Sequence, residues 1–435
     1  MKILFFHPNM PGQYKLLAPY FAQNKDNEVV FLTKPKPNVN FPNVRKVEFE
    51  VKRDAVKETH RYLVPTEKAV ISSQEVWRVC KKLKQEGFIP DVIVGHLGWG
   101  DGMFFKDIFP DSPILSFMEF FYSANGADIN FLPGDKTTPD DAARLRVKNL
   151  MHLDNLTNCD WGITPTYFQL HRHPEIFHQK ISVLHDGIDT DKVKPDAHKR
   201  LALPNGITLS REDEVVTYIS RNFEPYRGFP QFMKAAEKIL KDRPNCHIVM
   251  IGQDGISYGK GPEGGKTYRQ QMMEECNIDE SRFHFLGYVA HEDMVKVMQI
   301  SSAHIYLTVP FVLSWSMMEA MSAGCVMIGS NTAPVLEVLE HEKNGLVVDF
   351  FDIDDIANNV SRALDNKTEM QTLRDNARQT ILDRYSFDKT LPLHVGLITD
   401  LAEGKTPPPT AKKIEEFNKD IKYVDQVKQI EKEVA

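Results

Sequence analysis

The sequence predicts an α/β protein with two doubly wound, Rossmann-like domains, each a parallel sheet covered by helices. Short apolar segments alternate with helical patterns along most of the chain. Many of these segments are apolar throughout, which is typical of strands covered on both faces. At 435 residues the chain is also too long for a single hydrophobic core.

The predicted strands form two series. The first comprises Ile3–His7, Glu28–Thr33, Asp91–His96, Ile114–Glu119, Trp161–Thr164 and Ile181–Leu184. The second comprises Val215–Ser220, His247–Gly252, Phe283–Leu286, Ala303–Leu307, Val326–Gly329 and Leu346–Val348. A polar segment, Asp189–Leu209, separates them and is interpreted as a linker, so we predict domains at residues 1–195 and 196–400. Because such sheets bind ligands at the carboxyl ends of their strands, a shared ligand is expected in a cleft between the domains.

The remaining segment, residues 401–435, differs in composition. Thr406–Thr410 contains three consecutive prolines and predicts a stiff, extended spacer. Apolar residues then recur every three or four positions from Ile414 to Val427, which predicts an amphipathic helix. Packing on its own protein, homo-oligomerisation through 411–435 and binding of a partner all remain open for so short a helix.

Composition excludes several classes of protein. A net charge of −7 and a pI near 6.1 argue against a nucleic-acid-binding protein. Five scattered cysteines without a C-x-x-C spacing indicate a reducing cytosol, with neither a disulfide framework nor a zinc knuckle. The apolar start at Met1–Phe6 is too short for a signal peptide, and no apolar run reaches the length of a membrane-spanning helix. We expect a cytoplasmic protein, with peripheral contact at the inner face of the membrane left open.

The segment Pro310–Gly324 is the most informative motif. It follows a predicted strand and leads directly into a helix, so backbone N–H groups and the positive end of the helix dipole point outward from a sheet edge. Glu319, early in that helix, can reach the hydroxyls of a sugar on the same ligand. An anion site beside a carboxylate suits a nucleotide-sugar, although Ser316 and Glu319 also spell an S-x-x-E capping box that needs no ligand.

A second motif follows the first strand of the second domain. The segment Ser220–Gly228 carries Arg221 and Arg227, whose planar guanidinium groups match phosphate oxygens in pairs. Gly228 would allow close backbone approach where the next helix starts. A surface loop with solvated arginines is the alternative interpretation.

These motifs, in this order, resemble the retaining family 4 glycosyltransferases with the GT-B fold. The resemblance covers residues 1–400 almost completely and rests on R-x₅-R-G at Arg221–Gly228 and E-A-M-x-x-G at Glu319–Gly324. Further segments similar to the family are Phe285–Val289, Asn331–Val338 and Asn344–Val348. In the first half, the segments similar to one bacterial branch of it are His7–Tyr14, Val94–Gly100 and His185–Asp189.

The resemblance implies a role for each matched residue. Arg221 and Arg227 would hold the diphosphate of the donor, and Glu319 would accept hydrogen bonds from the ribose. Gly12 would let the backbone of the first, acceptor-side domain approach the diphosphate, and Tyr288 would lie beside the base. Backbone N–H groups would complete the phosphate cradle, namely those of Leu313, Ser314 and Trp315.

Two positions depart from the family pattern. Phe311 stands where the first glutamate of the family's E-x₇-E motif would contact the transferred sugar. Glu119 stands where many members have a histidine near the reacting sugar, and His96 is the other candidate in the first domain. Glu119 and His96 would bind or orient the acceptor, and a purely structural role is the alternative for each.

The resemblance implies transfer of a hexosyl unit, with retention, from a UDP- or GDP-linked sugar to a glycan, lipid-linked or protein acceptor in bacterial glycan or polysaccharide biosynthesis. No metal is expected, although Asp189–Asp191 and Asp352–Asp354 each spell D-x-D. Two rival functions stay open: a UDP-N-acetylhexosamine epimerase, and a catalytically silent, glycosyltransferase-like partner protein.

Overall fold

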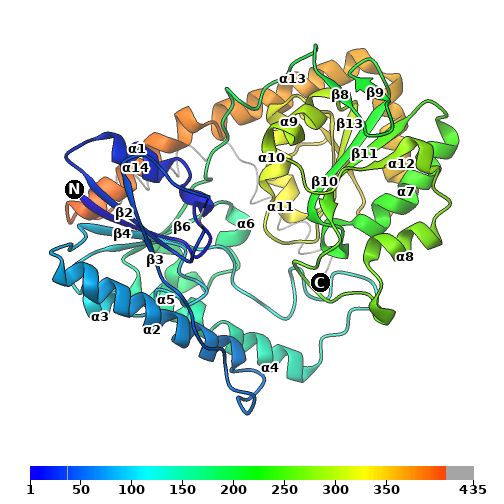
Figure 1. The fold of residues 1–435 in the computed structure, drawn as a ribbon. Coiled ribbons are helices and arrows are strands. Elements are labelled where there is room, and N and C mark those ends of the chain that lie inside the picture. Colours follow the sequence, from blue (N-terminus) through cyan, green and yellow to red (C-terminus); the bar gives the residue numbers. More distant parts are fainter. Residues whose placement is uncertain (37, 408–435) are drawn as a thin grey trace. The chain divides into compact units, whose positions relative to one another are not determined.

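The computed structural model describes residues 1–36 and 38–407, which divide into two compact units. The first unit contains residues 1–186 and 390–407, and the second contains residues 187–389 (Figure 1). The predicted helix at 411–435 and most of the Pro-rich spacer lie outside the described residues.

The unit boundaries differ from the predicted domains at 1–195 and 196–400. The chain enters the second unit at Gly187, where the backbone of Ile188 exchanges hydrogen bonds with Tyr385 and Phe387. It returns to the first unit at Thr390, because Leu397 and Ile398 are fully buried in the core of that unit. The predicted boundary rested on a polar segment. Composition does not show in which unit an apolar side chain is buried, so the observed boundaries could not be predicted from it.

The first unit contains a seven-stranded sheet whose strands are all parallel. Their order is β3-β2-β1-β4-β5-β6-β7. The strands are β1 (Lys2–Phe6), β2 (Glu28–Thr33), β3 (Val44–Glu48), β4 (Val92–Gly95), β5 (Ile114–Phe117), β6 (Trp161–Thr164) and β7 (Ile181–Val183).

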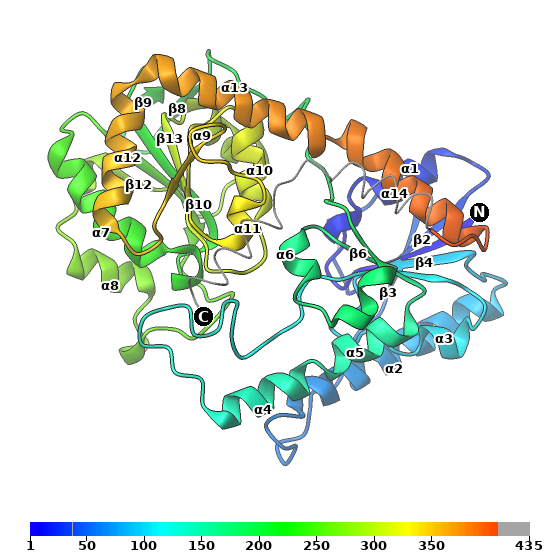
Figure 2. The same cartoon turned by 180° about the vertical axis from the view of Figure 1, so that it is seen from behind.

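Helices cover both faces of this sheet. In Figures 1 and 2, α1 and α14 lie on one face, and α2, α3 and α5 lie on the other. Each face has its own apolar cluster, one including residues of α1 and α14 and one including residues of α2, α3 and α5. The helices of this unit are η1 (Gly12–Tyr14), α1 (Leu17–Gln23), α2 (Val64–Gln85), α3 (Phe105–Ile108), α4 (Pro139–Lys148), α5 (Leu150–Asn158), α6 (Tyr167–Leu170), η2 (Glu175–Lys180) and most of α14 (Phe387–Ala402).

The second unit contains a parallel six-stranded sheet and a separate antiparallel hairpin. The strand order of the sheet is β12-β11-β10-β13-β14-β15. Its strands are β10 (Val215–Asn222), β11 (His247–Gln253), β12 (Phe283–Phe285), β13 (Ala303–Tyr306), β14 (Met327–Ser330) and β15 (Leu346–Val348); the hairpin is β8 (Arg200–Ala202) and β9 (Thr208–Ser210).

Helices also cover both faces of the second sheet. In both views α7 and α12 lie on one face and α9 and α10 on the other (Figures 1 and 2). The helices are η3 (Pro225–Arg227), α7 (Phe229–Asp242), η4 (Glu263–Gly265), α8 (Tyr268–Glu275), η5 (Glu280–Arg282), α9 (His291–Ile300), α10 (Trp315–Ser322), α11 (Ala333–Leu336), α12 (Ile353–Asp365) and α13 (Lys367–Arg384). Within the described part of the chain, no helix has both the length and the apolar character needed to span a bilayer.

Each predicted strand is present within a few residues, so the predicted α/β class with two doubly wound, Rossmann-like units is confirmed. Three strands were missed. β3 has the sequence V-R-K-V-E and lies at the edge of its sheet, where charged side chains remain in water. β8 lies inside the predicted linker 189–209 and β9 at its end, and each has only three residues.

Both sheets reverse their strand order at one point. The reversal lies between β1 and β4 in the first unit and between β10 and β13 in the second. At such a point the loops that leave the two strands diverge, which opens a crevice at the carboxyl ends of the strands. Most candidate site residues lie at or after the carboxyl ends of these four strands, whereas Glu119 follows β5 and Tyr288 follows β12.

Candidate functional site

The arginine motif of the second unit lies at the carboxyl end of β10. Arg221 is exposed and has no hydrogen-bond or ion-pair partner among residues 1–36 and 38–407. Arg227 ends η3 and is half-buried, and its Nη1 donates to the hydroxyl of Tyr306 at 3.1 Å and to that of Thr308 at 2.8 Å. One guanidinium is thus free to meet an anion, whereas the other is held in place.

Gly228 fits the start of α7, as the sequence predicts. Its φ is 63°, in the left-handed region, where a side chain is strained. A Cβ at this position would collide with Leu307, which directly follows β13. The missing side chain therefore lets the arginine loop lie against the neighbouring strand.

Glu224, a buried residue of this loop, was not among the predicted site residues. Its Oε2 accepts the backbone N–H groups of Ser257 and Tyr258 at 3.1 and 2.9 Å. Burial raises the pKa of Glu224, against the opposing effect of those two hydrogen bonds. Glu224 therefore fastens the loop after β11 to the arginine loop.

The helix of the principal motif, α10, begins at Trp315. Ser314 is its N-cap, and the hydroxyl of Ser314 accepts the N–H of Ser316 at 3.2 Å. The alternative S-x-x-E capping box is therefore wrong: Ser316 lies inside the helix, and Glu319 bonds elsewhere. The N–H of Ser314 donates to the Tyr306 hydroxyl at 2.8 Å, so one donor of the predicted phosphate cradle is already engaged.

Glu319 is buried on α10, with its carboxylate turned toward α9. Its Oε1 lies 2.8 Å from Nε2 of His291, the first residue of α9, whose side chain is half exposed. Both Oε1 and Oε2 have more than one lone pair, so this bond leaves acceptors for a ligand. His291 was not among the predicted site residues, because only the fold brings it to Glu319.

The other residues predicted for this half of the site differ in exposure. Phe311 is buried and makes edge contacts with Tyr226 and Tyr258, at ring-centroid distances of 5.8 and 4.8 Å. It therefore belongs to an aromatic cluster beside the arginine loop. Tyr288, in the loop after β12, is 83 % exposed. Leu313 precedes α10 and is buried, and Trp315 is the first residue of α10 and is partly exposed.

In the first unit, residues after β1 and β4 meet at the reversal of strand order. The rings of His7 and His96 are 5.4 Å apart, and both side chains are buried. Glu119, two residues beyond β5, has its Oε2 3.4 Å from Nε2 of His96. The fold thus brings together the two predicted residues, His96 and Glu119, and adds His7.

The protonation states in this cluster differ by residue type. Burial alone would raise the pKa of Glu119, but the combined effects of His96, His7 and His152 outweigh burial, and the pKa is lowered. Burial lowers the pKa of His7 and of His152 to about 3. At neutral pH Glu119 is therefore ionised, and His7 and His152 are neutral.

Gly12 packs directly on this cluster. Its φ is 51°, and a Cβ would collide with the His7 ring. The glycine is therefore required for packing against His7. Its predicted approach to the diphosphate stays a prediction.

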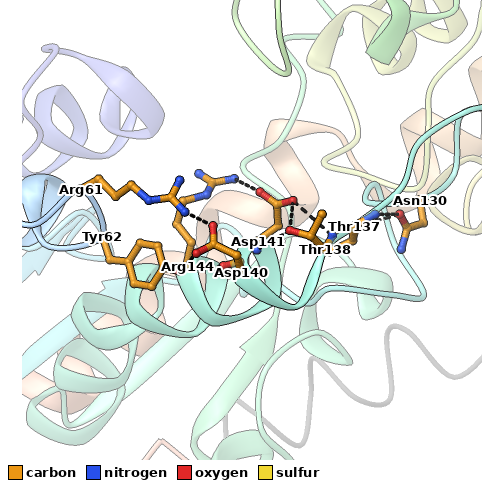
Figure 3. Close-up of polar contacts among 8 residues, drawn as sticks. All are labelled: Arg61, Tyr62, Asn130, Thr137, Thr138, Asp140, Asp141 and Arg144. Atoms are coloured by element: carbon orange, nitrogen blue, oxygen red, sulfur yellow. Dashed lines mark hydrogen bonds and ion pairs between the residues drawn. The ribbon is translucent and has the colours of Figure 1, made fainter.

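The loop Tyr122–Pro139 of the first unit is held by polar contacts (Figure 3). Oδ1 of Asn130 accepts the N–H and the hydroxyl of Thr137, at 2.9 and 2.7 Å. At the start of α4, Thr138 and Asp141 form a capping box, and Asp140 pairs with Arg61 and Tyr62. The loop therefore has a defined conformation at its carboxyl end.

The two D-x-D segments have structural roles. Asp189 pairs with Lys192 at 3.0 Å, and Asp352 accepts the N–H of Asp355 as the N-cap of α12. Among the described residues, no three His, Cys, Asp or Glu side chains converge as a metal site would need.

Acid should destabilise the first unit through its buried histidines. Burial lowers the pKa of five of them to about 3 or 4, namely His7, His152, His173, His185 and His394. Between pH 6.5 and those values the unfolded chain binds more protons than the folded chain does. The contribution of these neutral histidines to stability is therefore complete above about pH 7 and is lost as the pH falls. Each histidine should lower the free energy of unfolding by up to about 1.4 kcal/mol for each pH unit in that window.

Urea unfolding at pH 7 and pH 5 measures this effect. His394→Gln, which removes one such group away from the candidate site residues, should reduce the difference between the two pH values. The exposed His60→Gln should leave it unchanged. Equal stability of the wild type at both pH values would contradict the prediction.

Comparison with known proteins matches each half of the chain to a glycosyltransferase domain. Residues 25–193 match the Glycosyl transferase family 4 group, and residues 205–380 match the Glycosyl transferases group 1. The fold resembles sucrose-phosphate synthase from Thermosynechococcus elongatus, with a TM-score of 0.68 at 17 % identity, over 93 % of this chain and 100 % of that one. It also resembles Anabaena HepE in complex with UDP-glucose, with a TM-score of 0.63 at 14 % identity, over 93 % and 99 %. The fold is thus of the GT-B type.

Curated relatives match at lower coverage. An uncharacterised glycosyltransferase of Methanocaldococcus jannaschii is 21 % identical over 211 residues, which are 48 % of this chain and 51 % of that protein. The UDP-Gal:α-D-GlcNAc-diphosphoundecaprenol α-1,3-galactosyltransferase of Escherichia coli is 23 % identical, over 51 % and 55 %. A GDP-mannose-dependent α-(1-6)-phosphatidylinositol monomannoside mannosyltransferase of Mycobacterium tuberculosis is 24 % identical, over 48 % and 53 %. The chain thus spans about half the length of the curated relatives it matches.

Proposed function

Since the chain carries a family 4 group domain and a group 1 domain of the glycosyltransferases, we propose that it is an enzyme transferring a hexosyl unit from a nucleoside-diphosphate sugar to an acceptor hydroxyl. One observation carries the proposal. The Tyr306 hydroxyl accepts hydrogen bonds from both Arg227 and the N–H of Ser314, so it links the arginine loop to the N-terminus of α10. Guanidinium groups beside a helix N-terminus suit a diphosphate.

The proposed donor is a UDP- or GDP-linked sugar. One relative named above uses UDP-galactose and another depends on GDP-mannose, and HepE was crystallised with UDP-glucose. In this chain Arg221 and Arg227 would hold the diphosphate and Glu319 the ribose. Tyr288 would lie beside the base, and the backbone at Leu313, Ser314 and Trp315 would complete the cradle, with Ser314 exchanging its bond to Tyr306 for a phosphate oxygen.

The proposed mechanism retains the anomeric configuration. As the bond to the sugar breaks, negative charge grows on the diphosphate, and preorganised donors stabilise that charge best in the transition state. The departing phosphate oxygen takes the proton of the acceptor hydroxyl on the same face. Glu119 and His96 would orient the acceptor. The two arginines and α10 supply positive charge, so the mechanism assigns no step to a metal.

The acceptor is proposed to be a glycan, a lipid-linked glycan or a protein. A setting in bacterial polysaccharide or glycoconjugate synthesis fits the relatives that act on diphosphoundecaprenol- and phosphatidylinositol-linked substrates. A cytoplasmic protein with peripheral membrane contact suits such acceptors, and a homo-oligomer through 411–435 remains a prediction.

A thermal-shift panel of UDP, GDP, ADP and their sugar conjugates tests the function. A ligand at 100 times its dissociation constant should stabilise the protein by about 2.7 kcal/mol, and we expect a UDP or GDP compound to do so. Product analysis of the bound nucleotide-sugar should give slow hydrolysis, or transfer when an acceptor is added. A free epimer would identify an epimerase instead, and a flat panel would indicate a catalytically silent partner protein.

A further inference from the structure

Trp99 is a large aromatic residue exposed beside the histidine cluster of the first unit. It lies in the loop after β4 and is 41 % exposed. Its ring stacks on that of His96, with 4.0 Å between centroids and 33° between planes, and meets the edge of His7 at 5.8 Å. One face of the indole is thus fixed against the protein, which leaves area for a ligand.

The loop that carries Trp99 is held against α2. The hydroxyl of Ser73 donates to the carbonyl of Gly100, and that of Ser72 donates to Asp101. The N–H of Gly100 donates to the carbonyl of Leu97 at 2.9 Å. Because the loop is fixed before any ligand arrives, little conformational entropy is lost when a ligand stacks on Trp99.

A buried polar side chain without a hydrogen bond lies next to the indole. His96 is 1 % exposed, and neither ring nitrogen is hydrogen-bonded within the described residues, although Nε2 lies 3.4 Å from Oε2 of Glu119. Buried polar atoms normally have partners, so such an atom indicates a group that arrives from outside. The side chain of Glu119 is about one-third exposed and offers acceptors beside it.

We propose that Trp99 is the stacking platform for a pyranose ring of the acceptor, and that hydroxyl groups of this ring bond to Glu119 and His96. A pyranose has an apolar C–H face and a polar rim, and this site offers an aromatic face bordered by a carboxylate and an imidazole. The proposal deepens the proposed function and rests on it for the acceptor role. It makes Trp99 a specificity-determining residue for a saccharide acceptor.

Saturation-transfer NMR with methyl pyranosides of glucose, galactose, mannose and N-acetylglucosamine tests binding without any donor. At least one should bind the wild-type protein, and Trp99→Ala should weaken this binding about tenfold, because the contact with the indole face is lost. Trp99→Phe should give an intermediate affinity, because it keeps a smaller ring. Tyr20→Ala, which removes an equally exposed aromatic residue on α1, should bind as the wild type does.

A kinetic measurement separates this proposal from the function itself. In Trp99→Ala the KM of the pyranoside acceptor should rise about tenfold, and the KM of the nucleotide-sugar should rise much less. Saccharide binding that depends on Trp99 in a protein that binds no nucleotide-sugar would refute the function but support the saccharide site. Absence of pyranoside binding at millimolar concentration, or an unchanged affinity in Trp99→Ala, would overturn the platform.

Discussion

Replacing Arg221 with alanine should reduce turnover by two to three decades, corresponding to about 2.7–4 kcal/mol of transition-state stabilisation. Its guanidinium is exposed and has no hydrogen-bond or ion-pair partner in the described part of the chain, so its removal breaks neither kind of contact. The thermal midpoint should therefore stay within about a degree or two of the wild-type value, as for most surface substitutions. A large loss of rate without loss of stability identifies a residue whose partner is the ligand.

Steady-state kinetics with the nucleotide-sugar found in the panel measures this effect. Arg221→Lys keeps the charge but loses the planar fork and should recover only part of the rate. Arg200→Ala is the matched control, because Arg200 is an exposed arginine of the same unit, on β8. Near-normal turnover of Arg221→Ala would refute the diphosphate role.

The second large effect is expected at Glu319. Glu319→Gln removes the charge that would accept hydrogen bonds from the ribose, and such charged hydrogen bonds contribute about 1.5–3 kcal/mol. The affinity for the nucleotide should fall by about one to two decades. The fold should tolerate the change because His291, which loses its charged partner, is half exposed and can bond to water.

Calorimetric titration with the free nucleotide isolates this contribution from chemistry. His291→Gln should weaken binding less than Glu319→Gln, because His291 acts only through the carboxylate it holds. Glu292→Gln, a neighbouring and highly exposed carboxylate on α9, is the control for charge alone. Unchanged nucleotide affinity in Glu319→Gln would mean that the carboxylate serves only to join α10 to α9.

Most strands could be predicted because a strand buried on both faces is apolar throughout, and such a segment is recognisable in the sequence. Segments such as Trp161–Thr164 and Leu346–Val348 are predicted to the residue. The edge strand β3 is not such a segment, since three of its five residues are charged. The unit boundary escaped prediction because α14 has the same apolar pattern whichever unit it packs against.

The candidate site was predictable where the motif itself holds the chemistry, as at Arg221, Arg227 and Glu319. It was not predictable where a function depends on a contact between distant segments. His291 lies 28 residues before Glu319 in sequence, and Tyr306 lies 79 residues after Arg227. Neither residue has a local pattern that separates it from an ordinary helix or strand residue.

The position of α14 has a consequence for biosynthesis. The core of the first unit includes Leu397, Ile398 and Leu401, which leave the ribosome only after the whole second unit has been made. During translation, the apolar face that these side chains later cover stays incomplete, while every segment of the second unit emerges. The second unit can therefore fold first, and a chain terminated at residue 186 would expose that face to aggregation.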